Sequence, residues 1–163
     1  MVVRRGVILN STNIQCKVRN TEVFSTKEDY GLRAALDLAM YASSGPVQTH
    51  EISKRQDIPE AYLNQILVAL RRAGIIRSVR GASGGYTLAK PPGAITAGDV
   101  VRALRGEIFS VPASADAQQP SAVSQLWASV REAVEKLLDS VTLSDLLEKQ
   151  YQIDQSLSYM AHI

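Results

Sequence analysis

Residues 52–86 read ISKRQDIPEAYLNQILVALRRAGIIRSVRGASGGY, and this stretch decides the fold. A short helix, a turn, an amphipathic helix and a glycine-rich hairpin follow one another in it without a gap. This order predicts a winged helix-turn-helix, in which the second helix enters a DNA groove and the hairpin forms a wing beside it. DNA binding is therefore the first functional hypothesis.

The second helix of this unit has one apolar face and one outward ridge. Pro59 suits its first turn, where a missing N–H costs nothing. At the 3.6-residue period the inward face comprises Leu63, Ile66, Leu67, Leu70 and Gly74. The outward ridge comprises Ala61, Gln65, Val68 and Arg72, flanked by Tyr62, Asn64 and Arg71. Amides such as those of Asn64 and Gln65 can bond base edges bidentately. The same ridge is also compatible with an ordinary solvated face, and the adjacent hairpin favours the DNA-reading interpretation.

The hairpin is predicted to run from Ile75 to Arg80 and back from Tyr86 to Ala89. Arg77 and Arg80 lie on its first strand, and a long cation near a hairpin tip can reach phosphates or a narrow minor groove. The turn between the strands contains Gly81, Gly84 and Gly85. These glycines lack the spacing of a nucleotide-binding loop, so we interpret them as wing-turn residues.

Two helices are predicted before the reading unit. The first begins at a capping box formed by Ser25 and Glu28. Its apolar stripe comprises Leu32, Ala35, Leu36, Ala39 and Met40. The second is a short helix from His50 to Gln56 with Thr49 as its N-cap. The first helix should support the reading unit from behind.

Beyond the wing, Thr96 and Asp99 cap a short helix that runs through Leu104. After a loop, apolar residues recur at alternating steps of four and three, which is typical of the a/d seam of a coiled coil. The seam comprises Val123, Trp127, Val130, Val134, Leu137 and Val141. A single core-facing helix could show the same stripe, but a winged domain that dimerises needs such a helix. A last helix, Leu146 to Gln150, is expected to pack across the partner.

Several segments together resemble the Rrf-two family of bacterial transcription regulators, the IscR-, NsrR- and CymR-like proteins. The resemblance runs from about Phe24 to Tyr151 and rests on residues 27–34, 52–56, 62–67, 70–74 and 79–86. It implies a homodimeric winged-helix regulator that binds double-stranded DNA at a partly palindromic operator. It also implies that Tyr62, Asn64 and Gln65 stand where such regulators touch base edges.

One departure from the family pattern bears on mechanism. Cluster-binding members carry three closely spaced cysteines before the long C-terminal helix, because thiolates hold an iron–sulfur centre. The matching window, residues 107–127, reads EIFSVPASADAQQPSAVSQLW and contains no cysteine or histidine. We therefore expect no cofactor and no metal site. The resemblance is closest to the cluster-free branch, which implies control by a regulatory protein partner or a small metabolite.

Charge, cysteine content and hydropathy agree with this interpretation. Residues 25–90 carry nine Lys/Arg against six Asp/Glu, whereas residues 91–163 carry five against nine, so the basic excess lies with the proposed reading unit. Cys16 is the only cysteine, which excludes an internal disulfide. No apolar run is long enough for a membrane span. We expect a cytoplasmic protein, and no nucleophile–base set indicates an enzyme.

The sequence thus predicts a mainly α protein with a winged helix-turn-helix over residues 24–106, a two-stranded wing, and a long C-terminal dimerisation helix. Residues 107–122 form a loop, residues 123–151 the dimerisation helices and residues 152–163 a tail. Residues 1–23 are an extension that is compatible with an upstream start codon, a flexible basic arm or an extra strand. The predicted function is a homodimeric repressor. The alternative is a protein-interaction module that docks a metabolic enzyme and binds DNA weakly.

Overall fold

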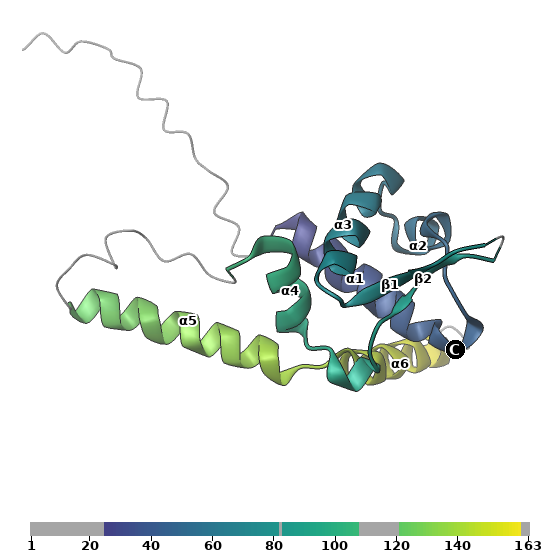
Figure 1. The fold of residues 1–163 in the computed structure, drawn as a ribbon. Coiled ribbons are helices and arrows are strands. Elements are labelled where there is room, and N and C mark those ends of the chain that lie inside the picture. The colour runs from purple at the N-terminus through teal and green to yellow at the C-terminus, as the bar shows by residue number, and fades with distance from the viewer. Residues whose placement is uncertain (1–24, 82, 108–120, 161–163) are drawn as a thin grey trace, which may run out of the picture.

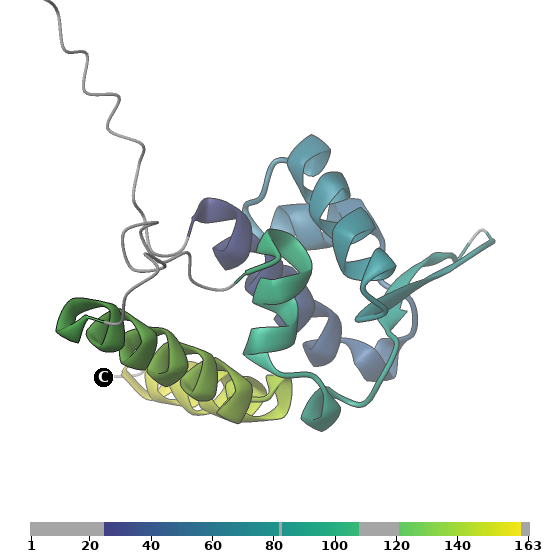
Figure 2. The same cartoon turned by 60° about the vertical axis from the view of Figure 1, so that its left-hand side comes forward.

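The computed structural model describes residues 25–81, 83–107 and 121–160, and these form a mainly helical protein with one antiparallel hairpin (Figure 1). This confirms the predicted fold class. Helices α1–α4 pack into one body, from which the hairpin extends at one end and α5 at the other. The second view shows the same opposition of hairpin and α5 (Figure 2). The predicted extension, residues 1–23, lies outside the described residues.

Helix α1 (Thr26–Met40) is the support on which the rest of the domain packs. It begins at the predicted capping box, because the backbone N–H of Ser25 donates to the Glu28 carboxylate. The apolar stripe was predicted only in part. Ala35 and Ala39 are buried as expected, whereas Leu32, Leu36 and Met40 are half-buried; the core side also contains Ala34, Asp37 and Leu38.

Helices α2 (Thr49–Gln56) and α3 (Glu60–Arg72) are joined by a sharp turn. Asp57 adopts a left-handed conformation with φ of 51°, and the N–H of Ile58 bonds to the carbonyl of Ser53. Pro59 then disfavours helical geometry at Ile58. Two predicted helix starts were wrong by one residue. Gln48, rather than Thr49, is the N-cap of α2, and Pro59 is the N-cap of α3 rather than part of its first turn.

The inward face of α3 is confirmed for Leu63, Ile66, Leu67 and Leu70, all fully buried. Gly74 does not belong to that face. It lies beyond the helix with φ of 70°, and its N–H bonds to Arg71 while the N–H of Ile75 bonds to Leu70. This Schellman arrangement requires a left-handed residue, which glycine adopts at little cost. The glycine ends the helix.

The wing consists of β1 (Ile76–Val79) and β2 (Gly85–Leu88), each close to its predicted bounds. Ile76 pairs with Leu88 and Val79 pairs with Gly85 in the antiparallel register. Ile76 and Leu88 are buried, so the base of the hairpin is part of the core and its tip extends into solvent. The short helix η1 (Ala42–Ser44) precedes α2.

Helix α4 (Ala97–Arg105) follows η2 (Pro92–Ala94) and packs against α1 and α3. Its predicted capping box is confirmed, because Thr96 and Asp99 exchange hydrogen bonds at 3.1 Å each. Gly31 permits the close packing of α1 on α4, since a Cβ at this position would overlap the Leu104 side chain.

The last two helices are α5 (Ala122–Ser140) and α6 (Leu143–Met160). The helix predicted for Leu146–Gln150 is therefore much longer, and most of the segment expected to be a tail is helical. Its first turns pack on the same chain rather than wholly across a partner, because Leu143 is fully buried and Leu146 and Leu147 contact the core. The Thr142 hydroxyl and Asp145 cap this helix.

One hydrophobic core unites α1–α4, the wing base and the start of α6. Its largest fully buried side chains belong to Leu38, Ile52, Ile58, Leu63, Ile66, Leu67, Leu70, Ile76, Ile95, Val100 and Leu143. Within the described ranges, none of the helices combines the length and apolarity that a bilayer span requires.

Candidate nucleic-acid interface

The outward side of α3 carries the amides that the sequence singled out. Asn64 and Gln65 are exposed. Leu63 and Leu67, on the opposite side of the same helix, are buried and anchor it in the core. Neighbouring residues on a helix point about 100° apart, so the two amides open in different directions from the same turn. The exposed part of this turn can therefore present donors and acceptors to a groove.

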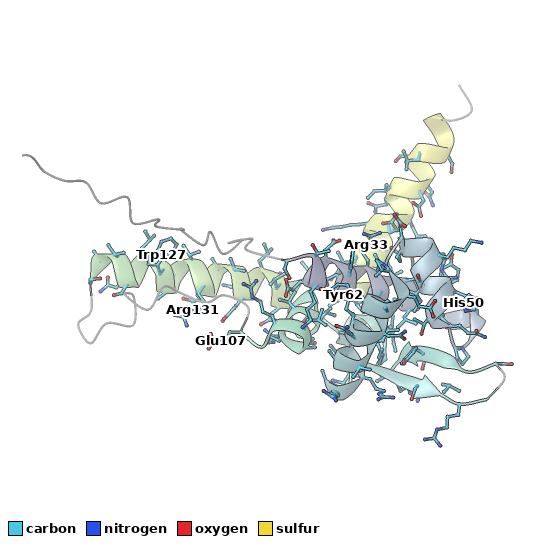
Figure 3. The ribbon with its side chains drawn as sticks, turned by 90° about the horizontal axis from the view of Figure 1, so that it is seen from above. Arg33, His50, Tyr62, Glu107, Trp127 and Arg131 are labelled. Carbon is cyan, nitrogen blue, oxygen red and sulfur yellow. The ribbon has the colours of Figure 1, made fainter. Side chains whose placement is uncertain are left out.

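Tyr62 differs from these two amides because its ring is half-buried. The ring packs edge-on against Tyr30, with ring centroids 5.9 Å apart and planes at 74°. The guanidinium of Arg33 lies 5.5 Å from the centroid of Tyr30. Figure 3 shows Tyr62 and Arg33 on the helical domain, at a distance from Trp127 on α5. The packing restricts Tyr62 to a fixed position beside Asn64 and Gln65.

Arg72 is exposed at the last residue of α3. At 1.5 Å per residue, it lies roughly 10 Å along the helix from Gln65. The structure therefore separates Arg72 from the amide-bearing turn, although both lie on the outward side. Arg71 and Arg72 also stand at the C-terminal end of the helix dipole, where cations are favourable.

A hydrogen-bond network around the buried Asp37 carboxylate fixes α2 on α1, and it was not among the sequence predictions. The carboxylate of Asp37 is fully buried and accepts hydrogen bonds from Arg55 Nε at 2.9 Å and Arg55 Nη2 at 2.7 Å. Gln56 Nε2 donates to the same carboxylate at 3.1 Å. Arg33 in turn donates to the backbone carbonyl of Gln56.

The hydrogen bond to Asp37 raises the pKa of Arg55, whose guanidinium also lies 4.0 Å from the ring centroid of Tyr41. A bidentate guanidinium–carboxylate pair fixes both distance and orientation. The network therefore sets the position of α2, which precedes the reading helix. Asp37 offered a signal in the sequence, because it stands among apolar residues that face the core.

The two wing cations have different surroundings. Arg77 Nε donates to the Thr87 hydroxyl on the opposite strand at 3.1 Å, so this side chain lies along the wing. Arg80 follows β1 and is exposed at the tip. It makes no hydrogen bond or ion pair with any residue of the described ranges. Arg80 is therefore available for an external anion.

The three wing glycines serve separate purposes. Gly81 has φ of 118°, and a Cβ on Gly84 would lie only 2.5 Å from the Val79 carbonyl oxygen. A Cβ on Gly85 would overlap the carbonyl group of Val47. This close approach exists because Val47 and Tyr86 exchange backbone hydrogen bonds of 2.9 and 2.8 Å. The wing is thereby joined to the segment before α2, which the sequence did not indicate.

A polar groove of about 340 Å³ separates the wing turn from the reading helices. It is lined by Gln48, Thr49 and His50 at the start of α2, by Glu60 at the start of α3, and by the wing-turn glycines. Figure 3 shows His50 on the side of the domain where the wing lies. The groove lies between the wing turn that follows Arg80 and the start of α3, the helix that carries Asn64 and Gln65.

Helix α5 presents its apolar seam to solvent in the single chain. Val123 is 61% exposed and Leu137 is 64% exposed, while Trp127, Val130 and Val134 are half-buried. An apolar row of this size normally marks a contact with another molecule. Figure 3 shows Trp127 on the part of α5 that stands away from the domain.

An ion pair and a backbone hydrogen bond from Ala97 to Val141 join α4 to α5. Arg102 Nη2 lies 2.6 Å from Asp139 Oδ1 and also donates to Asp99. The hydrogen bond from Arg102 to Asp139 raises the pKa of the guanidinium. Burial raises the pKa of Asp99, but hydrogen bonds from Thr96 and Arg102 outweigh it and the net pKa is lowered. Gly98 lies beneath the pair, since a Cβ there would meet the Asp139 carboxylate.

The donor set of this chain does not fit an iron–sulfur cluster. Such clusters require several thiolates, whereas the chain has one cysteine, Cys16, and none in residues 107–127. The loop predicted at the cluster position, residues 107–122, lies mostly outside the described residues. In the part of the chain that the structure describes, no group of three potential metal ligands converges.

Comparison with known proteins identifies the kind of protein that this architecture resembles. The sequence profile of the Rrf2 family, described as "Iron-dependent Transcriptional regulator", matches residues 24–149. The HTH-type transcriptional regulator CymR of Bacillus subtilis is 42% identical over 139 residues, which cover 85% of this chain and 98% of CymR.

Two solved structures extend the similarity to the fold. The solved structure of CymR from B. subtilis, described as the global cysteine regulator, superposes with a TM-score of 0.69 at 40% identity, covering 77% of this chain and 96% of that chain. IscR of T. potens gives a TM-score of 0.68 at 40% identity, covering 78% of this chain and 87% of that chain. The relatives that match the whole described domain are thus transcriptional regulators rather than enzymes.

Proposed function

Because this chain belongs to the Rrf2 family of helix-turn-helix transcriptional regulators, we propose that it is a homodimeric repressor that reads a partly palindromic operator. The reading residues are Asn64 and Gln65, with Tyr62 beside them. Arg80 at the wing tip supplies a phosphate or minor-groove contact, and Arg72 and Arg77 add backbone contacts farther out. A bacterial regulator of this kind acts in the cytoplasm, where the chromosome lies.

Asn64 and Gln65 are exposed on the outer side of a helix whose inner face is fully buried, and this observation carries the proposal. Side chains that specify sequence must reach base edges, and they must be held rigidly for the discrimination to be worth about 1–3 kcal/mol per bidentate pair. The core residues of α3 and the Asp37–Arg55 pair supply this rigidity. The basic wing tip then fixes the helix in the groove by charge.

The exposed seam of α5 supports the dimeric part of the proposal. Two copies joined along Val123, Trp127, Val130, Val134 and Leu137 would remove this apolar row from water. A two-fold dimer presents two reading helices, and their separation then sets the spacing of the two operator half-sites. Occupation of such a site would block transcription sterically, which is the basis for proposing repression.

Control by a protein partner or a small metabolite, rather than by a cluster, follows from the donor set of the chain. Without a thiolate group in residues 107–127, no family-type cluster can form between α4 and α5. The signal must then act on the protein surface or in a cavity.

A module that docks a metabolic enzyme, with weak DNA binding, is the second candidate. The exposed apolar residues of α6, Tyr151, Ile153 and Leu157, favour it because they leave an unpartnered surface beside the domain. The two candidates differ in salt dependence, since DNA binding releases counterions and docking on an apolar surface does not.

Selection of bound fragments from the source genome with the purified full chain separates them. The proposal predicts enrichment of a few fragments that share a two-fold symmetric sequence, with an affinity that falls steeply as salt is raised. Transcription from an enriched fragment in vitro should decrease when the protein is added. Recovery of random fragments at every salt concentration would reject sequence-specific reading and favour the docking module.

A further inference from the structure

The end of α5 is joined to the start of α4 by two backbone hydrogen bonds. The N–H of Ala97 donates to the carbonyl of Val141 at 2.8 Å, and the N–H of Leu143 donates to the carbonyl of Ile95 at 2.9 Å. Leu143 is also fully buried in the core, so the residues between α5 and α6 are held by the helical domain and do not form a free linker. This junction anchors one end of α5, but a single anchored point does not fix the direction of a helix.

A second contact fixes that direction. Asp139, in the last turn of α5, accepts hydrogen bonds from Arg102 Nη2 at 2.6 Å and from Arg102 Nη1 at 3.2 Å. One planar guanidinium thus engages both oxygens of the carboxylate, which restricts orientation as well as distance. Asp99 accepts from the same Nη2 at 3.3 Å and holds the guanidinium in place on α4.

The surroundings of this pair leave α5 little freedom. A Cβ added at Gly98 would overlap the Asp139 carboxylate and lie 3.1 Å from Arg102 Nη2. The carboxylate therefore rests against the backbone of α4, which a glycine at this position permits. The two side chains are 40% and 46% exposed, so the pair contributes to geometry more than to net stability.

Small rotations at this junction are amplified along α5. The helix has 19 residues and is therefore roughly 28 Å long at 1.5 Å per residue. Its first turns stand away from the helical domain (Figure 1). A rotation of about 10° at the junction would move the far end by roughly 5 Å, which exceeds the rise of about 3.4 Å per base pair of DNA.

We propose that the Arg102–Asp139 pair sets the spacing of the operator half-sites that the dimer accepts. This inference rests on the proposed function, a dimer joined along α5 that reads two half-sites. The pair fixes the angle between α5 and the reading domain, and the two-fold axis then fixes the separation of the two α3 helices. One additional base pair displaces a half-site by about 3.4 Å and turns it by about 35°, which a fixed junction does not follow. Both residues are positioning residues, because neither belongs to the proposed DNA contacts.

Selection from a pool of random duplex DNA with the full-length protein tests this role. The wild type should enrich one half-site sequence in inverted pairs at a single spacing. Arg102→Asp brings three carboxylates together and replaces attraction by repulsion, so it should enrich the same half-site sequence at several spacings. The double variant Arg102→Asp with Asp139→Arg restores a pair of opposite charges and should return to a single spacing. Lys149→Asp is the matched control, because it makes the same change of charge on α6 and breaks no ion pair of the described residues.

Titrations of fixed duplexes give the magnitude of the effect. One base pair added between the half-sites should weaken wild-type binding roughly tenfold or more, a loss comparable to that of a mismatched contact. The same insertion should weaken binding of Arg102→Asp by less than about threefold. Affinity for an isolated half-site should be equal in all four proteins, because α3 and the wing are unchanged, and sedimentation should show dimers throughout.

The outcomes separate this inference from the proposed function. A single spacing retained by Arg102→Asp, several spacings accepted by the wild type, or a double variant that is not restored would overturn the role of the pair while operator reading stands. Loss of the half-site sequence or of the dimer in Arg102→Asp would also overturn it, because the pair would then support the fold or the interface instead. A wild type that enriches no shared half-site would overturn operator reading itself, and this inference with it.

Discussion

The buried carboxylate of Asp37 accepts hydrogen bonds from Nε and Nη2 on one edge of the Arg55 guanidinium, at 2.9 and 2.7 Å. This pair connects the middle of α1 to the last turn of α2, the helix that precedes the reading helix. Burying a charge is costly unless it is paired, so the pair contributes more to the position of α2 than to net stability.

Arg55→Ala should therefore leave the buried Asp37 carboxylate without its charge partner and lower the free energy of unfolding by about 3 kcal/mol. Chemical denaturation measures this loss. Asp29→Ala is the control, because Asp29 is an exposed partner of Arg33 at 3.5 Å and its loss should cost less than about 1 kcal/mol. Equal losses in the two variants would mean that the buried pair has no special role.

The wing offers a second test, because Gly85 lies against the carbonyl group of Val47. Gly85→Ala should separate the wing from the segment before α2, destabilise the domain by about 1–3 kcal/mol and weaken DNA binding. Gly93→Ala is the matched control, since its added Cβ would meet Ser144 Cβ at an ordinary 3.9 Å. Thermal unfolding and band-shift titration compare the two. A wild-type affinity in Gly85→Ala would show that the close approach does not position the wing.

The local sequence pattern was sufficient to predict the reading helix and the wing. The four buried residues of α3 recur at the helical period, and the strands lie between recognisable turn residues. Contacts between distant segments could not be predicted in the same way. The hydrogen bonds of Val47 with Tyr86, and of Asp37 with Arg55, depend on the packing of elements that no local pattern relates.

Helix ends were harder to predict for a physical reason. Gly74 fits the apolar period of α3, but its φ of 70° places it outside the helix, and only the cap hydrogen bonds reveal this. The length of α6 was missed because its second half lies on the surface, although Ile153 and Leu157 keep a helical spacing of four. Among the residues of the proposed site, Asn64, Gln65 and Arg80 are exposed, in agreement with the prediction that they lie on the outer surface. The packing of Tyr62 on Tyr30 was not predicted.

The proposed dimer depends on α5, and Val130→Asp tests it. The substitution places a charge within the apolar seam and should weaken dimerisation by about 3 kcal/mol or more, because an ion would be buried without a partner. Ser129→Asp adds the same charge at the exposed neighbouring position, which is not part of the seam. Sedimentation should show monomers for the first variant and dimers for the second. A monomeric wild type, or an intact Val130→Asp dimer, would exclude this seam as the interface.

The absence of thiolate ligands in residues 107–127 leads to a prediction about iron. Protein purified without oxygen should be colourless and should contain no stoichiometric iron or sulfide, because a cluster needs several thiolates. Absorption spectroscopy and iron analysis measure this, with an iron–sulfur protein purified in parallel as the positive control. Charge-transfer absorption together with near-equimolar iron and sulfide would contradict the donor-set argument.

The central claim is that the reading helix recognises bases while the wing contacts the DNA backbone, and comparing variants of the two elements tests it most directly. Gln65→Ala, Arg80→Ala and the wild type are titrated with operator and scrambled DNA over a salt series. Gln65→Ala should lose preference for the operator, by about 1–3 kcal/mol, while its affinity for scrambled DNA stays near that of the wild type. Arg80→Ala should weaken binding to both DNAs and reduce the slope of log affinity against log salt by about one unit per subunit, if a phosphate contact is lost. Equal losses on both DNAs for both variants would contradict this division, and a wild type without operator preference at any salt would contradict DNA reading itself.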